Sequence, residues 1–305
     1  MSILPIPSFF QPEQVGKLWR VPYEERVQQA MDWAKTHQIA ESSQDEKKIS
    51  LFLVDLQNTF CLPDFELYVG GRDGQGAVND NRRLAKFIYQ NLDRISSICL
   101  TMDTHRAMQI FHAAFLVDQE GNHPPAYSMI TVDDLTSGRW KFNPALAAQF
   151  EITPKTGQER LLHYAKELAR KDKYAWTIWP YHAMLGGVGH AITPAIEEAV
   201  LFHSIARKTQ ADFRIKGEEP FTEHYSALGP EVLTGPHGEK LGERDIRLVD
   251  NLENLDALII AGQAKSHCVA WTVEDLLAEI QDRDPALAEK VYLLEDCTSA
   301  VVTPA

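Results

Sequence analysis

The chain has 305 residues, 44% of them hydrophobic, which is enough to bury the core of one large or two small globular domains. Its formal net charge of −13 at pH 7 argues against a nucleic-acid-binding surface, and no apolar run approaches the length of a membrane span. The first residues lack a basic segment followed by an apolar one, so we expect no secretory signal and a cytoplasmic location. The four cysteines are far apart in the sequence, which fits a reducing compartment better than a disulfide scaffold: Cys61, Cys99, Cys268 and Cys297.

Residues 1–48 are polar and contain several prolines, which indicates an arm outside the main domain. Within this arm, residues 23–36 carry apolar side chains at helical spacing and predict an amphipathic helix, with Ala30 and Met31 on its apolar face. We expect the arm to pack against the main domain or against a partner subunit. The main domain is predicted to span residues 49–305.

The main domain alternates predicted strands and helices. Residues 49–56 form a continuous apolar run, typical of a strand that is buried on both faces of a parallel sheet. Further strands are expected at residues 97–102, 211–216, 255–261 and 290–295, and helices at 79–95, 193–207 (with a strand-like end) and 269–281. This alternation predicts an α/β fold with a doubly wound, Rossmann-like, mainly parallel sheet of about six strands and helices on both faces.

Residues 113–178 are less regular than the rest of the main domain. Glycine, proline and asparagine cluster there at two places, and only residues 159–170 read as a helix. We therefore expect an inserted segment that acts as a lid or builds a subunit contact.

Side chains capable of chemistry follow four of the predicted strands. Asp55 ends the first strand, Asp103 and His105 end the second, and Lys216 ends the third. Cys268 follows the strand that ends in Ala-Gly, at a turn into a helix whose free N–H groups favour a thiolate. Each residue alone has an ordinary structural interpretation, as a capping aspartate, a snorkelling lysine or a buried thiol. Together they lie where such sheets bind ligands, at the carboxyl ends of the strands, and predict an active site.

The sequence Asp103-Thr-His105 can turn a carboxylate and an imidazole towards one ion. His112 and His182 follow later in the chain and could add further ligands. Carboxylate and imidazole ligands suit Zn²⁺, Mn²⁺ or Fe²⁺, with water at open positions. The spacing alone is also compatible with ordinary surface or core histidines; an ion bound here would be one divalent transition metal, with Zn²⁺ as the first choice.

Five motifs, in order from residue 49 to the C-terminal part of the chain, resemble those of the isochorismatase-like cysteine hydrolase superfamily, and most closely those of its nicotinamidase branch. They are VDLQNTF at 54–60, MDTH at 102–105, WPYH at 179–182, IKG with YSA at 215–217 and 225–227, and AGQAKSHCV at 261–269. The resemblance implies that Cys268 is the nucleophile, that Asp55 is its general base, and that Lys216 stabilises the thiolate and orients Asp55. It also implies backbone oxyanion donors at Ala264 and Cys268, with a cis peptide bond between Gln263 and Ala264.

The same resemblance implies the ligand set and the substrate pocket. Asp103, His105 and His182 match the metal ligands of the nicotinamidases, and His112 matches a further histidine at a different spacing. In that branch the metal binds the pyridine nitrogen of nicotinamide or a water molecule. The residues implied to contact the substrate are aromatic: Phe60, Trp179 and Tyr225.

We therefore expect a metal-containing cysteine amidohydrolase that converts a small aromatic amide to an acid and ammonia through a thioester. Its partner would be the small-molecule amide, without nucleic acid or membrane, and family resemblance favours a homo-oligomer. The long 113–178 segment and the unusual residues at 182–185 and before Cys268 keep one alternative open, a related hydrolase of an N-carbamoyl compound, a ureido acid or a vinyl ether. A second alternative is a catalytically silent binding protein, against which the presence of Asp55, Lys216 and Cys268 argues. The role of His267, beside the nucleophile, is left open.

Overall fold

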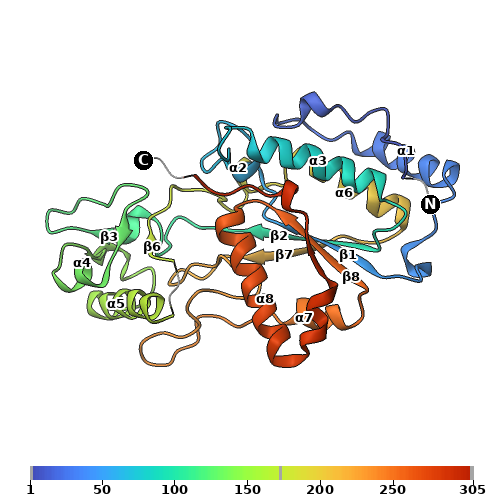
Figure 1. Cartoon of the computed structure of the whole chain (residues 1–305). Helices are drawn as coiled ribbons and strands as arrows, with labels where there is room; N and C mark the ends of the chain where they lie inside the picture. Colours follow the sequence, from blue (N-terminus) through green and yellow to red (C-terminus); the bar gives the residue numbers. More distant parts are fainter. Residues whose placement is uncertain (1–2, 172–173, 303–305) are drawn as a thin grey trace.

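The computed structural model describes residues 3–171 and 174–302. Its centre is a five-stranded sheet in which every neighbouring pair is parallel, in the order β7-β2-β1-β8-β9 (Figure 1). The strands are β1 Ile49–Val54, β2 Ser97–Asp103, β7 Asp212–Lys216, β8 Ala257–Gly262 and β9 Val291–Leu293. The strand order reverses between β1 and β8, and this switch point is where sheets of this kind form a ligand crevice.

Helices cover both faces of this sheet, as the alternating pattern predicted (Figure 1). On one face lie α3 (Gly76–Gln90) and α6 (Pro194–Arg207), and on the other lie α7 (Arg247–Glu253) and α8 (Ala270–Arg283). β1 is buried on both sides: Leu51 and Leu53 pack with α3 and α6, whereas Phe52 and Val54 pack with α7 and α8. The rigid ends of β1 and β8 can therefore hold catalytic groups in place.

The predicted α/β class is confirmed, but the sheet has five strands where about six were expected. The strand-like end assigned to residues 193–207 is helical, because the apolar residues of α6 continue at helical spacing up to Ala206 and the helix ends at Arg207. Lys208 follows in the left-handed conformation, with φ of 52°, and closes the helix. The helix predicted at residues 79–95 begins and ends earlier than expected, as α3.

The segment at residues 113–178 forms small elements to one side of the main sheet (green to yellow-green in Figure 1). They are β3 Leu116–Val117, β4 Met129–Ile130, α4 Val132–Thr136, β5 Lys141–Phe142, α5 Pro154–Arg170 and β6 Trp176–Thr177. β3 pairs with β5, and β4 pairs with β6, both antiparallel. The predicted helix at 159–170 lies inside α5, which starts earlier because the Thr153 hydroxyl caps it and Pro154 fits its first position. The domain boundaries remain a prediction.

The arm packs on the main domain through α1, whose bounds Tyr23–Thr36 agree with the prediction. The prediction that Met31 lies on the apolar inner face of this helix is wrong, because Met31 is 48% exposed. The helix is turned so that Arg26 lies inside, where its Nε donates a hydrogen bond of 2.7 Å to Glu198 Oε1 on α6. The guanidinium also lies 4.0 Å from the ring centroid of Phe9. In the described part of the chain, no helix has both the length and the apolar composition needed to cross a bilayer.

The Arg26–Glu198 ion pair generates a stability prediction, because both side chains are largely buried, at 11% and 6% exposure. Arg26→Ala should lower the free energy of unfolding by about 3 to 5 kcal/mol, since it leaves the Glu198 carboxylate buried without its cation. Adding Glu198→Gln should recover part of that loss. Chemical denaturation measures both effects, with the exposed Lys35→Ala on the same helix as control. A loss no larger than that of the control would contradict the assignment.

Candidate active site

The ammonium group of Lys216 lies at the centre of four groups at the carboxyl ends of the strands. Its Nζ is 3.0 Å from Asp55 Oδ2, 2.9 Å from Asp103 Oδ1 and 3.7 Å from Cys268 Sγ. It also donates a hydrogen bond of 2.9 Å to the carbonyl oxygen of His224. Asp55, Lys216 and Cys268 are at most 5% exposed. The structure thus brings together the three residues predicted as a triad.

Asp55 is held rigidly although it lies just beyond the end of β1. Its backbone has φ of 51°, a left-handed conformation that is uncommon outside glycine and occurs often at functional sites. Thr101 on β2 accepts a hydrogen bond of 3.0 Å from the Asp55 N–H and donates one of 2.6 Å to Asp55 Oδ1. The second carboxylate oxygen, Oδ2, lies 3.0 Å from Lys216 Nζ.

Cys268 lies within a π-helical turn, Lys265–Val269, that joins β8 to α8. Short π-helical segments are rare and often occur at functional sites. The turn follows two residues with positive φ, Gly262 at 137° and Ala264 at 58°. A side chain at Gly262 would place Cβ 2.2 Å from the carbonyl oxygen of Val54, so glycine is required for this close approach of β8 to β1.

The prediction of a cis peptide bond between Gln263 and Ala264 is wrong. No peptide bond among residues 3–171 and 174–302 is cis, and the chain turns here through the positive φ angles of Gly262 and Ala264. The N–H of Gln263 is already used, since it donates a hydrogen bond of 2.9 Å to Val54 O. The oxyanion role of the Ala264 and Cys268 N–H groups stays a prediction.

The electrostatics of the site favour a neutral thiol beside a charged lysine. Burial raises the pKa of Cys268 well above its usual value, the Lys216 cation opposes that rise, and the Asp55 carboxylate adds to it. Burial alone would lower the pKa of Lys216, but the Asp103 and Asp55 carboxylates hold it well above the usual value. The thiol therefore needs a base to become a nucleophile, and the Asp55 carboxylate lies near enough to be a candidate for that base.

A second cluster next to Lys216 can hold a metal ion. Asp103, His105 and His182 each offer a ligand atom, and these atoms all lie within 4.8 Å of one another. Asp103 Oδ2 is 2.7 Å from His105 Nε2 and 3.6 Å from His182 Nε2. Although burial alone would raise the pKa of Asp103, the charges of His105 and Lys216 hold it well below the usual range.

Hydrogen bonds around this cluster orient the imidazoles as metal ligands. His182 Nδ1 lies 2.7 Å from the carbonyl oxygen of Pro180, and His105 Nδ1 lies 3.3 Å from that of Gly217. With a proton on each Nδ1, each Nε2 would be the atom that binds the ion, which is the arrangement typical of ligating histidines. Gly217 itself leaves room for the cluster, because a Cβ there would lie 2.9 Å from His105 Cε1. The donor set therefore fits Zn²⁺ or a similar ion.

His112 lies beside the cluster but outside the group whose ligand atoms are mutually close. Its ring centroid is 5.9 Å from that of His105 and 6.3 Å from that of His182. Burial lowers the pKa of His112 to about 3, so the ring is neutral at physiological pH. A role for His112 as a fourth ligand stays a prediction.

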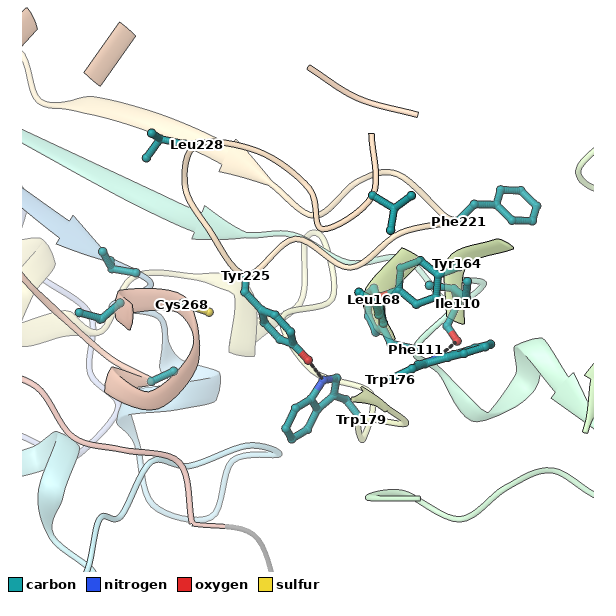
Figure 2. Packing of buried hydrophobic residues seen from close by; sticks show 14 of the residues in the cluster. Ile110, Phe111, Tyr164, Leu168, Trp176, Trp179, Phe221, Tyr225, Leu228 and Cys268 are labelled. Carbon is teal, nitrogen blue, oxygen red and sulfur yellow. Dashed lines mark hydrogen bonds between the residues drawn. The ribbon is translucent and has the colours of Figure 1, made fainter. Parts of the chain in front are cut away.

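The three aromatic residues predicted to contact substrate line one narrow cavity with Cys268, Lys216 and Asp103: they are Phe60, Trp179 and Tyr225. Trp179 Nε1 donates a hydrogen bond of 2.9 Å to the Tyr225 hydroxyl, and Figure 2 shows this bond beside the Cys268 sulfur. His267 also lines the cavity, with its ring centroid 5.4 Å from that of Trp179. The thiol thus opens into an aromatic pocket adjoining the metal-binding cluster.

Sequence reasoning missed several residues that shape the site. Gln57 joins β1 to β2: its Nε2 donates a hydrogen bond of 2.7 Å to Asp103 O, and its Oε1 accepts one of 2.7 Å from Asp103 N–H. A signal for Gln57 existed in the VDLQNTF motif, since a fully buried glutamine needs such partners. Thr101 and Val301 carried no comparable signal, although Val301 lines the cavity.

Comparison with known proteins places this fold. No protein-family model matches the chain, and no curated protein matches its sequence. The solved structure of the yeast nicotinamidase Pnc1p matches with a TM-score of 0.51 and 18% identity, over 83% of this chain and 89% of that one. The same yeast enzyme bound to the inhibitor nicotinaldehyde matches with a TM-score of 0.51 and 17% identity, over 83% and 89%. The nicotinamidase/pyrazinamidase of Acinetobacter baumannii matches with a TM-score of 0.47 and 18% identity, over 85% and 88%. The chain has the fold of a nicotinamidase, which confirms the predicted resemblance at the level of the fold.

The raised pKa of Cys268 predicts how its alkylation depends on pH. Because the thiolate is the reactive form, the rate of modification by iodoacetamide should rise about tenfold per pH unit between pH 7 and 9. Mass spectrometry of the Cys268 peptide measures this rate. Cys61, Cys99 and Cys297 are buried outside the cavity, so their modification serves as a control that reports unfolding of the chain over the same pH range. A rate that is already constant below pH 8 would mean a thiolate in the resting protein.

The donor set predicts uptake of one Zn²⁺ per chain by chelator-treated protein, measured by calorimetry and elemental analysis. His182→Ala should weaken this binding by more than about 100-fold, because the loss of a ligand exceeds the usual cost of losing a hydrogen bond to one. His112→Ala should weaken Zn²⁺ binding less than His182→Ala does if Asp103, His105 and His182 are the complete set of protein ligands. The exposed His237→Ala is the matched control. Binding that survives His182→Ala would contradict the site.

Proposed function

We propose that this chain is a metal-containing cysteine amidohydrolase of the nicotinamidase type. The observation that carries the proposal is the contact of Lys216 with Asp55, Asp103 and Cys268, because it joins a nucleophile, its base and a metal-binding cluster in one pocket. The shared fold with the yeast nicotinamidase supports this reading, although identity of 18% leaves the reaction to be established from the site. The substrate would be a small aromatic amide, and the products an acid and ammonia.

In the proposed reaction Asp55 takes the proton of the Cys268 thiol, and the thiolate attacks the carbonyl carbon of the amide. The ammonium of Lys216 stabilises the thiolate as it forms, and backbone N–H groups of the catalytic turn stabilise the negative oxygen of the tetrahedral intermediate. Asp55 then returns the proton to the departing nitrogen, so that ammonia leaves and a thioester remains on Cys268. Water, deprotonated by Asp55, attacks the thioester and releases the acid and the thiol.

Asp103, His105 and His182 would hold the metal ion in this proposal. When bound, the ion offers an electrophilic position to a lone pair of the substrate, such as a ring nitrogen. The residues of the chain then orient the carbonyl: Lys216 connects Asp103 to the triad, and the aromatic side chains of the pocket pack against the ring. The ends of β2 and β7, which carry Asp103 and Lys216, would therefore connect the metal-binding cluster to the triad.

An aromatic amide suits the pocket better than a charged or flexible one. The cavity presents aromatic rings from Phe60, Trp179 and Tyr225, against which a flat ring can stack or pack edge to face. The yeast nicotinamidase was solved with nicotinaldehyde as an inhibitor, and an aldehyde on a similar ring is a chemically sensible probe for this thiol as well. Of the alternative substrates, an N-carbamoyl compound or a ureido acid would also release ammonia on hydrolysis, whereas a vinyl ether would not.

The assay is ammonia release from a panel that contains nicotinamide, pyrazinamide, an aliphatic amide and an N-carbamoyl compound. We expect turnover of the aromatic amides, and a loss of at least about 1,000-fold in kcat with Cys268→Ala because that variant has no nucleophile. Asp55→Asn should cost a comparable amount. Cys99→Ala, a buried cysteine outside the site, is the matched control and should keep its activity.

Two outcomes of this assay would contradict the proposal. Undiminished activity of Cys268→Ala would exclude the thioester route. Turnover of only the aliphatic or N-carbamoyl substrates by the wild-type chain would keep the hydrolase mechanism and reject the nicotinamidase-type substrate.

A further inference from the structure

Val301 lines the active-site cavity although it belongs to none of the catalytic motifs. It faces the same space as Cys268 and Trp179, from a stretch of chain that follows β9. It is partly buried and packs against both apolar cores, the one under α3 and α6 and the one under α7 and α8. An aliphatic side chain therefore forms part of the cavity wall at the point where the two apolar cores meet.

The stretch that carries Val301 is bound to the catalytic turn by two hydrogen bonds. The N–H of Lys265 donates to Ser299 O at 2.7 Å, and the N–H of Val301 donates to Ser266 Oγ at 3.1 Å. On its other side Ser299 packs against Gly76, where a Cβ would lie 2.6 Å from Ser299 Oγ. The position of residues 299–301 relative to Cys268 therefore depends on the catalytic turn.

The same turn links residues 299–301 to the aromatic side of the cavity. Ser266 Oγ, which accepts the hydrogen bond of Val301, lies 2.9 Å from His267 Nδ1 and can donate its own proton there. The His267 ring lies 5.4 Å from that of Trp179 and 5.3 Å from that of Tyr225. Burial lowers the pKa of His267 to about 4, so this ring packs as a neutral group. The unusual Lys-Ser-His run before the nucleophile thus acquires a structural role.

The cavity is narrow enough for one aliphatic side chain to matter. Only about 20 Å³ is open to the centre of a water molecule, little more than a single water requires. Interiors are close-packed, so any ring that binds here must displace part of the wall, and a substituent on that ring must displace more of it or be excluded. Among the walls, residues 299–301 are held to the turn by two hydrogen bonds, whereas Cys268 and Lys216 are fixed by the sheet and its helices.

We propose that residues 299–301 are the size-selecting wall of the substrate pocket. Val301 is the specificity-determining residue, and Ser266 positions it. The wall admits a small flat amide and excludes amides whose ring carries an alkyl group on the side that faces Val301. The choice of amide as substrate rests on the proposed function, whereas the wall itself rests on the contacts of Val301 and Ser266.

The first test compares kcat/KM for nicotinamide with kcat/KM for a series of ring-alkylated nicotinamides. Val301→Gly should raise the ratio of at least one alkylated amide to nicotinamide about tenfold, the smallest discrimination usual for one methylene group in an apolar pocket. Val301→Ala should move the ratio in the same direction by less. Ser266→Ala should also raise it, because Val301 N–H loses its acceptor. Val302→Gly is the matched control, since the neighbouring valine is 62% exposed and should leave the ratio unchanged.

The second test needs no turnover and separates this inference from the proposed function. The rate of Cys268 alkylation is measured by mass spectrometry with iodoacetamide and with the bulkier N-phenyl iodoacetamide. The measured quantity is the rate with iodoacetamide divided by the rate with N-phenyl iodoacetamide. Val301→Gly should lower this ratio about tenfold, and Val302→Gly should leave it unchanged. If no amide is hydrolysed but the alkylation preference narrows, the proposed function fails and the wall stands. If Val301→Gly leaves the alkylation preference at the wild-type value, or Val302→Gly changes it equally, the wall is refuted.

Discussion

The buried ammonium of Lys216 is the interaction on which the rest of the site depends. It is 4% exposed and lies between two carboxylates, 3.0 Å from Asp55 and 2.9 Å from Asp103. A cation buried so deeply is tolerable only because these charges and the carbonyl of His224 replace its water. Since Asp55 belongs to the proposed triad and Asp103 to the candidate metal-binding cluster, one cation connects the two halves of the site.

This arrangement explains why the strands must end where they do. The parallel order of β7, β2 and β1 sets Lys216, Asp103 and Asp55 side by side. The reversal of strand order between β1 and β8 then opens the crevice into which Cys268 is turned. Gly262 permits the close approach of these two strands, and the π-helical turn that follows aims the thiol at its base. The sheet therefore fixes how the candidate catalytic groups lie relative to one another. In our proposal the size of the pocket is set by residues 299–301, which lie outside the sheet.

The strand ends could be predicted because apolar runs and the polar residues after them are local features of a sequence. Asp55, Lys216 and Cys268 were assigned to one site on that basis and on motif order, and the structure brings them into contact. The number of strands, the inner face of α1 and the geometry at Gln263 depend on long-range packing, and there the prediction was wrong. Val301 is missed for the same reason, because its role arises from tertiary hydrogen bonds to the catalytic turn.

In the mechanism we propose, Cys268 is activated by Asp55 beside Lys216 and forms a thioester with the acyl group of a small aromatic amide. The most direct measurement is mass spectrometry of the intact chain and its Cys268 peptide after acid quenching of the first turnover with nicotinamide. We expect a transient mass increase of one nicotinoyl group on Cys268, formed as the first ammonia is released. First-turnover ammonia release with no adduct, or with the adduct on another residue, would contradict it.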